Sequence, residues 1–287
     1  MQTAAQTAQA LLAAGVARLR AAGIDGAARD ARWLLAYALG IAPERVTLVL
    51  PDPVSAAQAA GFERAIGARA QHQPVAQIMG QRLFWGRAFQ ITPDVLDPRP
   101  ETETLIAAAL ERDFGTILDL GTGSGAIVWT LLAERSGACG LAVDLSPKAL
   151  DVARTNAAAL GLAGRVDFRL SNWWEAVTGS FDLIVSNPPY IAAPDYSALP
   201  PDLRLWEPRM ALVPDACDGT GLAAYRAIIA QAPAFLRPSG WLMVEIGLGQ
   251  GPEVQALMEQ AGLNGAHILP DLTGRGRVVA AQARARA

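Results

Sequence analysis

A glycine-rich turn between an expected strand and an expected helix most strongly constrains how this 287-residue chain can fold. Residues 117–120 form a short apolar run typical of a buried strand, and residues 126–133 have the composition of a helix. Glycine alternates with small polar residues between them: Gly121, Thr122, Gly123, Ser124 and Gly125. Such glycines permit a tight turn and close approach of the backbone to a ligand, so the order predicts a nucleotide-binding unit of an α/β fold.

The next expected strand, residues 141–143, ends at Asp144, which is correctly placed to accept hydrogen bonds from ribose hydroxyls. This stretch alone is ambiguous, because Gly121, Gly123 and Ala126 also satisfy the dinucleotide pattern. Two further features favour S-adenosylmethionine. Asp119 brings a carboxylate near the turn, where it can help hold a cationic amino group directly or through water, and Asn172 and Trp173 follow the strand at 166–170, where they can edge an adenine.

A tetrapeptide rich in hydrogen-bond acceptors follows the next expected strand, residues 181–186, and consists of Asn187, Pro188, Pro189 and Tyr190. Both prolines lack an N–H, and Pro188 favours an extended Asn187. The Asn187 side-chain oxygen and the Pro188 carbonyl can together accept both hydrogens of a planar NH2 group, with the Tyr190 ring packed on its face. The alternative is a Pro-Pro strand stop with an Asn cap, since short motifs are weak evidence.

The order of elements predicts the fold class. Strands and helices alternate through the second half of the chain, and residues 267–269 and 277–280 are expected to close it as an antiparallel pair. This indicates a mostly parallel sheet with helices on both faces. The long loop expected at residues 191–219 is typical of a lid or binding surface.

Upstream of this region we expect a small helical bundle over residues 1–78 and a β-hairpin linker over residues 79–98, leaving residues 99–287 as the cofactor-binding domain. The hairpin is predicted as strands 82–85 and 88–92 joined by Gly86 and Arg87. Asp97, Glu101 and Glu103 precede a helix through Leu110, and their spacing favours helix capping over cofactor contact. The bundle's arginines are expected to form either a solvated surface or a partner-recognition face: Arg18, Arg20, Arg29, Arg32, Arg64 and Arg69.

Composition excludes several classes of protein. The formal charge of −3 argues against affinity based on neutralising phosphates, so no stable nucleic-acid binding is expected. With His72 and His267 as the only histidines, a metal site or a histidine-based triad is not expected. Cys139 and Cys217 share no metal or redox spacing, which predicts buried, inert thiols in a reducing compartment. Without a signal peptide or an apolar span, a cytoplasmic protein with no membrane partner is expected. A monomer is expected because no helical seam or edge strand in the sequence indicates self-association.

Together these motifs are similar to the release factor glutamine methyltransferases (the PrmC/HemK family). The resemblance covers nearly the whole chain and rests on Phe84-Trp85, residues 96–103, residues 118–125, residues 186–190, residues 206–208 and Arg277-Val278. It implies a Rossmann-like class I methyltransferase domain preceded by a helical substrate-recognition domain. It also implies that residues 121–125, Asp144 and Trp173 contact S-adenosylmethionine, with Asp119, Asn172 and Asn187 as further contacts. The family often has Asp where this chain has Asn172, so cofactor affinity is expected to fall by roughly 1 kcal/mol.

The same resemblance implies methyl transfer from S-adenosylmethionine to the side-chain amide nitrogen of the glutamine in the Gly-Gly-Gln motif of class 1 peptide chain release factors. Asn187, Pro188, Pro189 and Tyr190 are then expected to hold that glutamine, with Asn187, Pro188 and Tyr190 as the catalytic set. Two other substrates fit the same acceptors, namely a glutamine of a large-subunit ribosomal protein and the adenine amino group of a nucleic acid. A non-enzymatic assembly module would require a damaged pocket.

Overall fold

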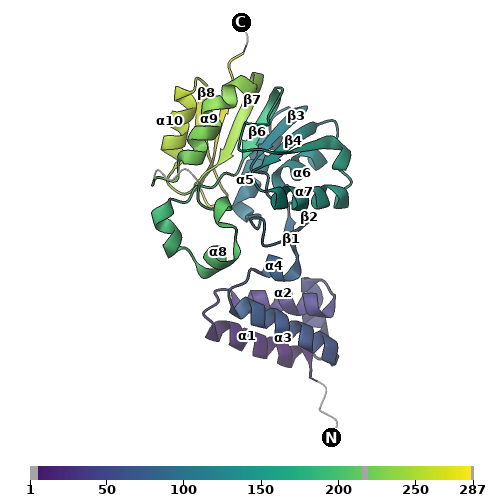
Figure 1. The fold of residues 1–287 in the computed structure, drawn as a ribbon. Helices are drawn as coiled ribbons and strands as arrows, with labels where there is room; N and C mark the ends of the chain where they lie inside the picture. The colour runs from purple at the N-terminus through teal and green to yellow at the C-terminus, as the bar shows by residue number, and fades with distance from the viewer. Residues whose placement is uncertain (1–5, 215–218, 286–287) are drawn as a thin grey trace. The chain divides into compact units, whose positions relative to one another are not determined.

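The structure is a computed structural model that describes residues 6–214 and 219–285. The described residues form two compact units (Figure 1). Residues up to Gly80, together with Pro200–Trp206, make the first unit, and Gln81–Leu199 with Glu207 onward make the second. The chain therefore crosses between the units three times. In the part of the chain described, no helix combines the length and the apolar character needed to cross a membrane.

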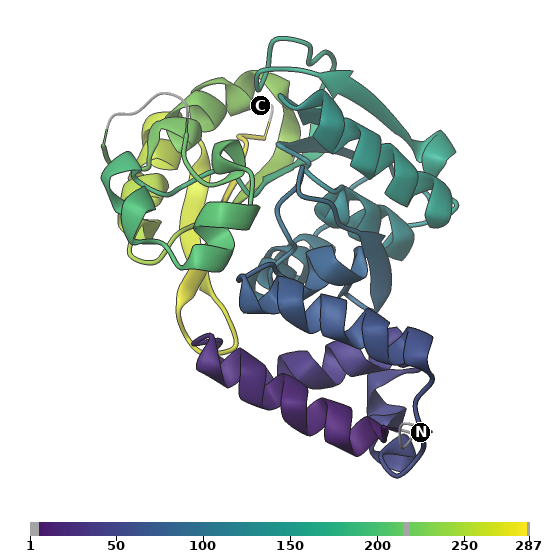
Figure 2. The same cartoon turned by 60° about the horizontal axis from the view of Figure 1, so that its bottom comes forward.

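The first unit is a helical bundle, as the sequence predicts. Its elements are α1 (Ala8–Ala21), α2 (Ala27–Leu39), η1 (Pro43–Val49), α3 (Ala56–Ala70) and α4 (Val75–Met79). Helix α3 begins with a capping box in which the Ser55 hydroxyl and the Gln58 side chain satisfy each other's backbone N–H groups. Figure 2 brings the purple and blue helices of this bundle to the front. Helix α1 packs against α3, where Gly15 leaves room for the ring of Phe62. A Cβ at residue 15 would lie 2.6 Å from that ring, so the helices approach closely.

A short helix from the second half of the chain, α8 (Pro201–Trp206), belongs to the same unit. The Trp206 indole N–H donates to the Gln71 carbonyl at 2.9 Å, and the Gln77 side chain donates to the Trp206 carbonyl at 2.8 Å. The expected loop at 191–219 thus contains ordered helical turns, η4 (Ala193–Ala198), α8 and η5 (Arg209–Ala211).

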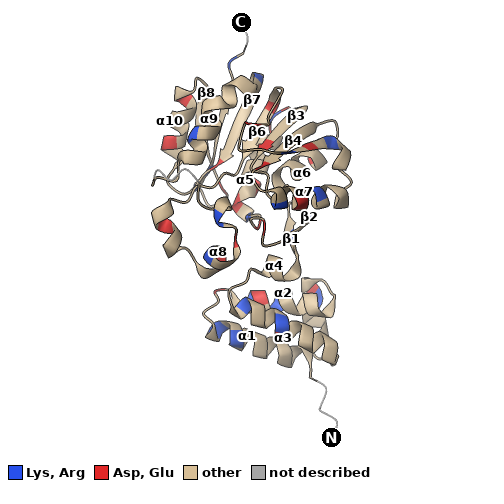
Figure 3. Ribbon diagram, viewed as in Figure 1, with Lys and Arg blue, Asp and Glu red and all other residues tan. Residues whose placement is uncertain are grey.

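Figure 3 marks the positions of Lys and Arg along the bundle in blue. Four of the six predicted arginines are exposed: Arg18, Arg20, Arg29 and Arg64. The prediction was wrong for Arg69, which is 8% exposed and forms an ion pair with buried Asp30 at 2.8 Å. The Arg69 guanidinium also donates to the Gln73 carbonyl, so its burial is compensated by hydrogen bonds. The sequence contains the arginine but does not reveal a partner 39 residues away.

The second unit begins with a hairpin of β1 (Gln81–Phe84) and β2 (Arg87–Gln90). Its turn lies at Trp85 and Gly86, one residue earlier than predicted. Both residues have positive φ, +48° and +72°, as a two-residue turn of type I′ requires to match the twist of the strands. The hairpin is tied to the sheet domain because the Asn156 side-chain oxygen accepts from the Gln90 N–H at 2.6 Å.

A seven-stranded sheet organises the rest, with strand order β5-β4-β3-β6-β7-β9-β8. Five strands are parallel, and β9 pairs antiparallel with both β7 and β8. This confirms the mostly parallel sheet with a closing antiparallel pair. The strands are β3 (Thr116–Leu120), β4 (Cys139–Asp144), β5 (Val166–Leu170), β6 (Phe181–Ser186), β7 (Leu236–Glu245), β8 (Asn264–Pro270) and β9 (Gly276–Gln282).

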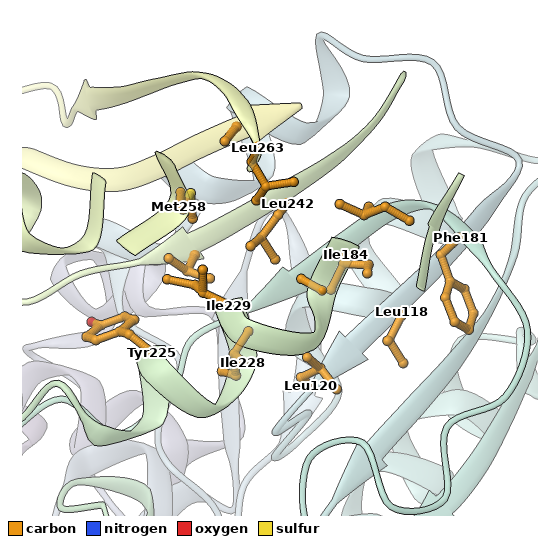
Figure 4. Packing of buried hydrophobic residues seen from close by; sticks show 14 of the residues in the cluster. Leu118, Leu120, Phe181, Ile184, Tyr225, Ile228, Ile229, Leu242, Met258 and Leu263 are labelled. Atoms are coloured by element: carbon orange, nitrogen blue, oxygen red, sulfur yellow. The ribbon is translucent and has the colours of Figure 1, made fainter. Parts of the chain in front are cut away.

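Helices lie on both faces of this sheet (Figure 1). They are η2 (Pro100–Thr102), α5 (Glu103–Leu110), α6 (Ala126–Glu134), α7 (Pro147–Ala159), η3 (Ala163–Arg165), α9 (Ala223–Phe235) and α10 (Gly251–Gln260). Figure 4 shows Tyr225, Ile228 and Ile229 of α9 packed over Leu120 and Ile184 of the central strands. This apolar core fixes where the strands end, and the site is built on those ends.

The predicted burial of the cysteines was wrong for Cys139, which is exposed. Cys139 is the first residue of β4, where the strand emerges from the sheet, whereas Leu141, Ala142 and Val143 within the strand are buried. Cys217 lies outside the described residues.

Candidate functional site

The carboxyl ends of β3, β4, β5 and β6 meet at one edge of the sheet, where a cavity of about 610 Å³ opens. This is where open α/β sheets bind ligands. The cavity is lined by most of the residues that the sequence singled out, namely Gly121, Thr122, Gly123, Ser124, Asp144, Asn172, Trp173, Asn187 and Pro189. The structure therefore brings the glycine-rich turn and the start of the acceptor tetrapeptide to one cavity.

The glycine-rich turn folds back on the end of β4, because the N–H groups of Gly121 and Thr122 both donate to the Val143 carbonyl, at 2.9 and 3.0 Å. Gly125 ends the turn with φ +80° and begins α6. A Cβ there would lie 2.2 Å from the indole nitrogen of buried Trp129. Gly125 does not line the cavity. A glycine is therefore required at residue 125 because a larger side chain would collide with Trp129 beneath the turn, and not because of a contact with a ligand.

Asp144 lies at the mouth of this turn. One carboxylate oxygen accepts from the Gly123 N–H at 2.9 Å and the other from the Ser146 N–H at 2.8 Å. Burial raises the pKa of Asp144, and these backbone donors oppose the rise. Each oxygen keeps a second lone pair for a ligand hydroxyl. This geometry suits the predicted contact with ribose.

Asp119 is fully buried beneath the turn. One of its oxygens, Oδ2, accepts from the Thr122 hydroxyl at 2.7 Å, whereas Oδ1 is buried with no hydrogen-bond partner in the described part of the chain. Burial raises the pKa of Asp119 to about 7, and the nearby Asp144 carboxylate adds to the rise. Asp119 does not line the cavity, so its effect on a ligand would pass through Thr122 or a water molecule.

Asn172 and Trp173 lie in the turn after β5. Trp173 has φ +50°, and its carbonyl accepts from the Ser171 hydroxyl at 2.8 Å, which holds this strained residue against the Gly121 side of the cavity. The exposed Asn172 amide donates to Glu175 at 3.1 Å. That hydrogen bond leaves the Asn172 oxygen available as an acceptor.

The tetrapeptide is divided between the cavity and the core. Asn187 and Pro189 line the cavity, Pro188 is buried, and Tyr190 packs against the apolar core behind it. The Gln250 side chain donates to the Tyr190 carbonyl at 3.0 Å, and burial raises the pKa of Tyr190 to about 12. The tetrapeptide is thus braced from behind, with Asn187 foremost.

The acidic residues before α5 are not all helix caps, as the spacing had suggested. Asp97 is buried, and its carboxylate lies near Arg82 at 3.6 Å and Arg99 at 3.9 Å. Burial is the larger effect on Asp97 and raises its pKa. Glu103 begins α5 and accepts from the Trp85 N–H at 3.1 Å. Neither acid lines the cavity.

Comparison with known proteins identifies the family. A release factor glutamine methyltransferase from Cereibacter sphaeroides is 60% identical over 271 residues, covering 94% of this chain and 96% of that protein. The chain belongs to the release factor glutamine methyltransferase family. A second member, from Rhodospirillum rubrum, is 46% identical over 96% of this chain and 85% of its own length. Family models match as a PrmC N-terminal domain over residues 10–80 and a methyltransferase small domain over residues 96–198.

Solved structures of other proteins share the fold of this chain, although their sequences are less similar to it than those of the family members. A methyltransferase from Pyrococcus furiosus superposes with a TM-score of 0.54 at 15% identity, covering 70% of this chain and 91% of its own. A Thermus thermophilus 16S rRNA methyltransferase, solved with AdoMet and guanosine, superposes with a TM-score of 0.51 at 23% identity, and the match covers 71% of this chain and 50% of that chain. Both support a class I methyltransferase fold.

The sequence analysis did not identify two groups of buried residues near the site. Glu207 receives hydrogen bonds from the Arg99 guanidinium at 2.7 Å and from the Asp97 N–H at 3.1 Å. Thr102 lines the cavity, and Glu245 lies buried at the end of β7. Thr102 stood within the segment that carries the resemblance, but Glu245 had no sequence signal beyond being an acid at the end of an apolar strand.

Proposed function

We propose that this protein transfers a methyl group from S-adenosylmethionine to the side-chain amide nitrogen of the glutamine in the Gly-Gly-Gln motif of class 1 peptide chain release factors. Family membership supports this function. The observation that carries it is the meeting of Asn187 with the glycine-rich turn and Asp144 in a single cavity. Such a cavity can hold a nucleotide-like donor and a planar amide together.

The residues present fit S-adenosylmethionine. Asp144 has free lone pairs for ribose hydroxyls, the Asn172 oxygen and the Trp173 ring suit an adenine, and a buried Asp119 oxygen has no hydrogen-bond partner in the described chain. Because Asp119 does not line the cavity, its carboxylate would act on the cationic amino group through Thr122 or a water molecule, and a positive charge nearby would offset the cost of its burial. When bound, the cofactor supplies an electrophilic methyl group on a sulfonium.

The protein's part in the reaction is positioning. The Asn187 side-chain oxygen and the Pro188 carbonyl would accept the two amide hydrogens of the glutamine, so that the amide nitrogen faces the methyl group for direct displacement. Tyr190 does not line the cavity, and it would support the tetrapeptide from the side of the apolar core. A neutral amide is a poor nucleophile, so exclusion of water and alignment carry most of the acceleration. No strong base is needed beforehand, because the nitrogen becomes acidic once it is methylated.

The helical region over residues 1–78 would recognise the protein substrate, with the hairpin over residues 79–98 as linker and residues 99–287 as the catalytic domain. Exposed arginines on the bundle support this role, since they present cations to a large partner. We expect the protein to be a monomer in the cytoplasm, where newly made release factors are available. We expect no membrane partner and no stable complex with a nucleic acid.

Mass spectrometry of peptides tests the proposal. A cognate release factor is incubated with S-adenosylmethionine and either the wild-type protein or Asn187→Ala. We expect one additional methyl group on the Gly-Gly-Gln glutamine with the wild type and none with the variant. Methylation of a large-subunit ribosomal protein instead, or of adenine in a nucleic acid, would assign the same pocket to a different substrate.

A further inference from the structure

The backbone of the acceptor tetrapeptide is held at its last residue by the side chain of Gln250. The Gln250 amide nitrogen donates to the Tyr190 carbonyl at 3.0 Å, although the two residues are 60 positions apart in the sequence. We propose that Gln250 is a positioning residue for methyl transfer, because this hydrogen bond fixes the Pro188 carbonyl and the Asn187 side chain where they meet the substrate amide. The inference rests on the proposed function, in which those two acceptors hold the glutamine NH2.

The tetrapeptide has few backbone donors with which to anchor itself. Pro188 and Pro189 lack an N–H, so neither can donate to a neighbouring segment. The upstream end is held in the sheet by the pairing of β6 with β3, and downstream the Ile191 N–H donates to a loop carbonyl at 2.9 Å. Gln250 supplies a donor to the residue that directly follows the two prolines. It therefore anchors the tetrapeptide at a point where its own backbone donors are missing.

The orientation of the Gln250 amide is fixed by the groups around it. The Gly247 N–H can only donate, and it lies 3.0 Å from the Gln250 Oε1 atom. The Tyr225 hydroxyl lies 3.3 Å from the same oxygen and donates to the Glu245 carbonyl at 3.0 Å. The Tyr190 carbonyl can only accept, and it faces the Gln250 NH2. Reversing the amide would place donor against donor and acceptor against acceptor, so a single orientation satisfies both backbone contacts.

Two glycines leave the space that this contact occupies. A Cβ at residue 221 would lie 2.3 Å from the Tyr190 carbonyl oxygen and 3.1 Å from the Gln250 amide nitrogen. A Cβ at residue 247 would lie 2.7 Å from the Gln250 Oε1 atom and 3.0 Å from the Tyr190 ring. Side chains at these positions would push Gln250 and Tyr190 apart. Gly221 and Gly247 are therefore required for the hydrogen bond to form.

Capping of α10 does not explain Gln250. The residue is the N-cap of α10, a position that favours short polar side chains bonded to the first helical turn. Within the described residues, the Gln250 side chain makes no hydrogen bond to that turn. Both ends of its amide are used outside the helix, on Gly247 and Tyr190. The side chain thus supports the tetrapeptide and not its own helix.

The anchor can be observed at one atom. Tyr190-Ile191 is the only Tyr-Ile pair in the sequence, so full-length protein with 13C at the tyrosine carbonyl and 15N at isoleucine gives a single HNCO peak. At pH 8 we expect Gln250→Glu, whose ionised side chain can only accept, to move the Tyr190 carbon signal upfield, because the carbonyl loses its donor. Gln250→Met keeps the length of the side chain without a charge and should do the same. A signal that keeps its wild-type position in either variant would overturn the inference.

Tyr225→Phe is the matched control. It removes a buried hydroxyl beside the Gln250 Oε1 atom, but Gly247 still holds that oxygen and the donation to Tyr190 is retained. We expect this variant to lower the free energy of unfolding without moving the Tyr190 signal. Its kcat should stay within about twofold of wild type.

Kinetics decide whether the anchor acts on the reaction. We expect Gln250→Glu and Gln250→Met to lower kcat roughly 10- to 100-fold, because a small displacement of the acceptors misaligns the amide nitrogen, with the Kd for S-adenosylmethionine within about twofold of wild type. A wild-type kcat in these variants, or an equal loss of kcat in Tyr225→Phe, would overturn the inference. If the wild type methylates no glutamine while the Tyr190 signal moves as expected, the proposed function fails and the anchoring of the tetrapeptide stands.

Discussion

The donor end of the cavity, at the glycine-rich turn, and the substrate end, at Asn187, are assembled differently. At the cofactor end, Asp119 holds Thr122, three residues further along the chain. At the substrate end, the Asn187 amide nitrogen lies 3.4 Å from the hydroxyl of Thr102, which is 85 residues away in the sequence. Binding of the donor thus depends on the glycine-rich turn and on the residues that follow β4 and β5, whereas positioning of the amide depends on the tetrapeptide after β6 and on Thr102. The two functions should therefore separate in variants.

Loss of the Asn187 side-chain oxygen should have the largest effect on the rate of methyl transfer. It should also distinguish the substrate end of the cavity from the donor end most clearly. Asn187→Ala removes the oxygen that holds the substrate amide without touching the glycine-rich turn. We expect the rate of methyl transfer to fall by roughly 10³ or more, with the affinity for S-adenosylmethionine within a few-fold of wild type. Stopped-flow transfer assays and calorimetric binding on the same preparation measure both. If Asn187→Ala lowered the affinity for S-adenosylmethionine as much as the rate of methyl transfer, the two ends of the cavity would not be functionally separate.

Replacing Gly125 in the glycine-rich turn should lower the free energy of unfolding far more than replacing Gly123. Gly125→Ala places a Cβ 2.2 Å from the buried Trp129 ring and also forces φ of +80° on an alanine. We expect a destabilisation of ~3 kcal/mol or more, measured by urea unfolding.

Gly123→Ala is the matched control, because Gly123 also has positive φ but no atom within 4 Å of its Cβ position. Its cost should be only the ~1 kcal/mol of the left-handed backbone. Equal destabilisation by the two variants would show that Trp129 does not enforce glycine at residue 125.

Asp119 predicts a pH dependence of stability. Its pKa is raised from 3.8 to about 7, so between these values the folded protein binds more protons than the unfolded chain, and stability falls as pH rises. Asp119→Asn removes this term. The melting temperature of the variant minus that of the wild type, both without cofactor, should rise between pH 4 and pH 7 by on the order of a few degrees. Saturating S-adenosylmethionine should shrink the difference. A difference that is constant with pH would contradict the assignment.

The smallest effect is expected at the adenine edge. Asn172→Asp introduces a charged acceptor where the family often has one, and the change should tighten S-adenosylmethionine binding by about 1 kcal/mol, or roughly fivefold. Asn172→Ala, which removes the acceptor, is the control and should weaken binding. Titration calorimetry distinguishes the two, and unchanged affinity in both variants would remove Asn172 from the cofactor site.

The same contrast explains what could be predicted from the sequence. The glycine-rich turn, Asp144 and the strand before Asn187 were readable because their contacts lie within short segments with strong apolar runs and fixed turn chemistry. The ion pairs Arg69–Asp30 and Arg99–Glu207 were not, since tertiary packing alone brings them together. Exposed Cys139 shows a related limit, because an apolar run locates a strand more reliably than its ends.

Rescue by cofactor concentration tests the separation of the two ends most directly. Single-turnover methyl transfer to the release factor glutamine is measured for Asn187→Ala and for Asp144→Asn while S-adenosylmethionine is raised to saturation. We predict that Asp144→Asn, impaired in binding the donor, recovers most of the wild-type rate, whereas Asn187→Ala recovers none. Recovery of both variants, or of neither, would contradict a cavity with one end for the donor and the other for the amide.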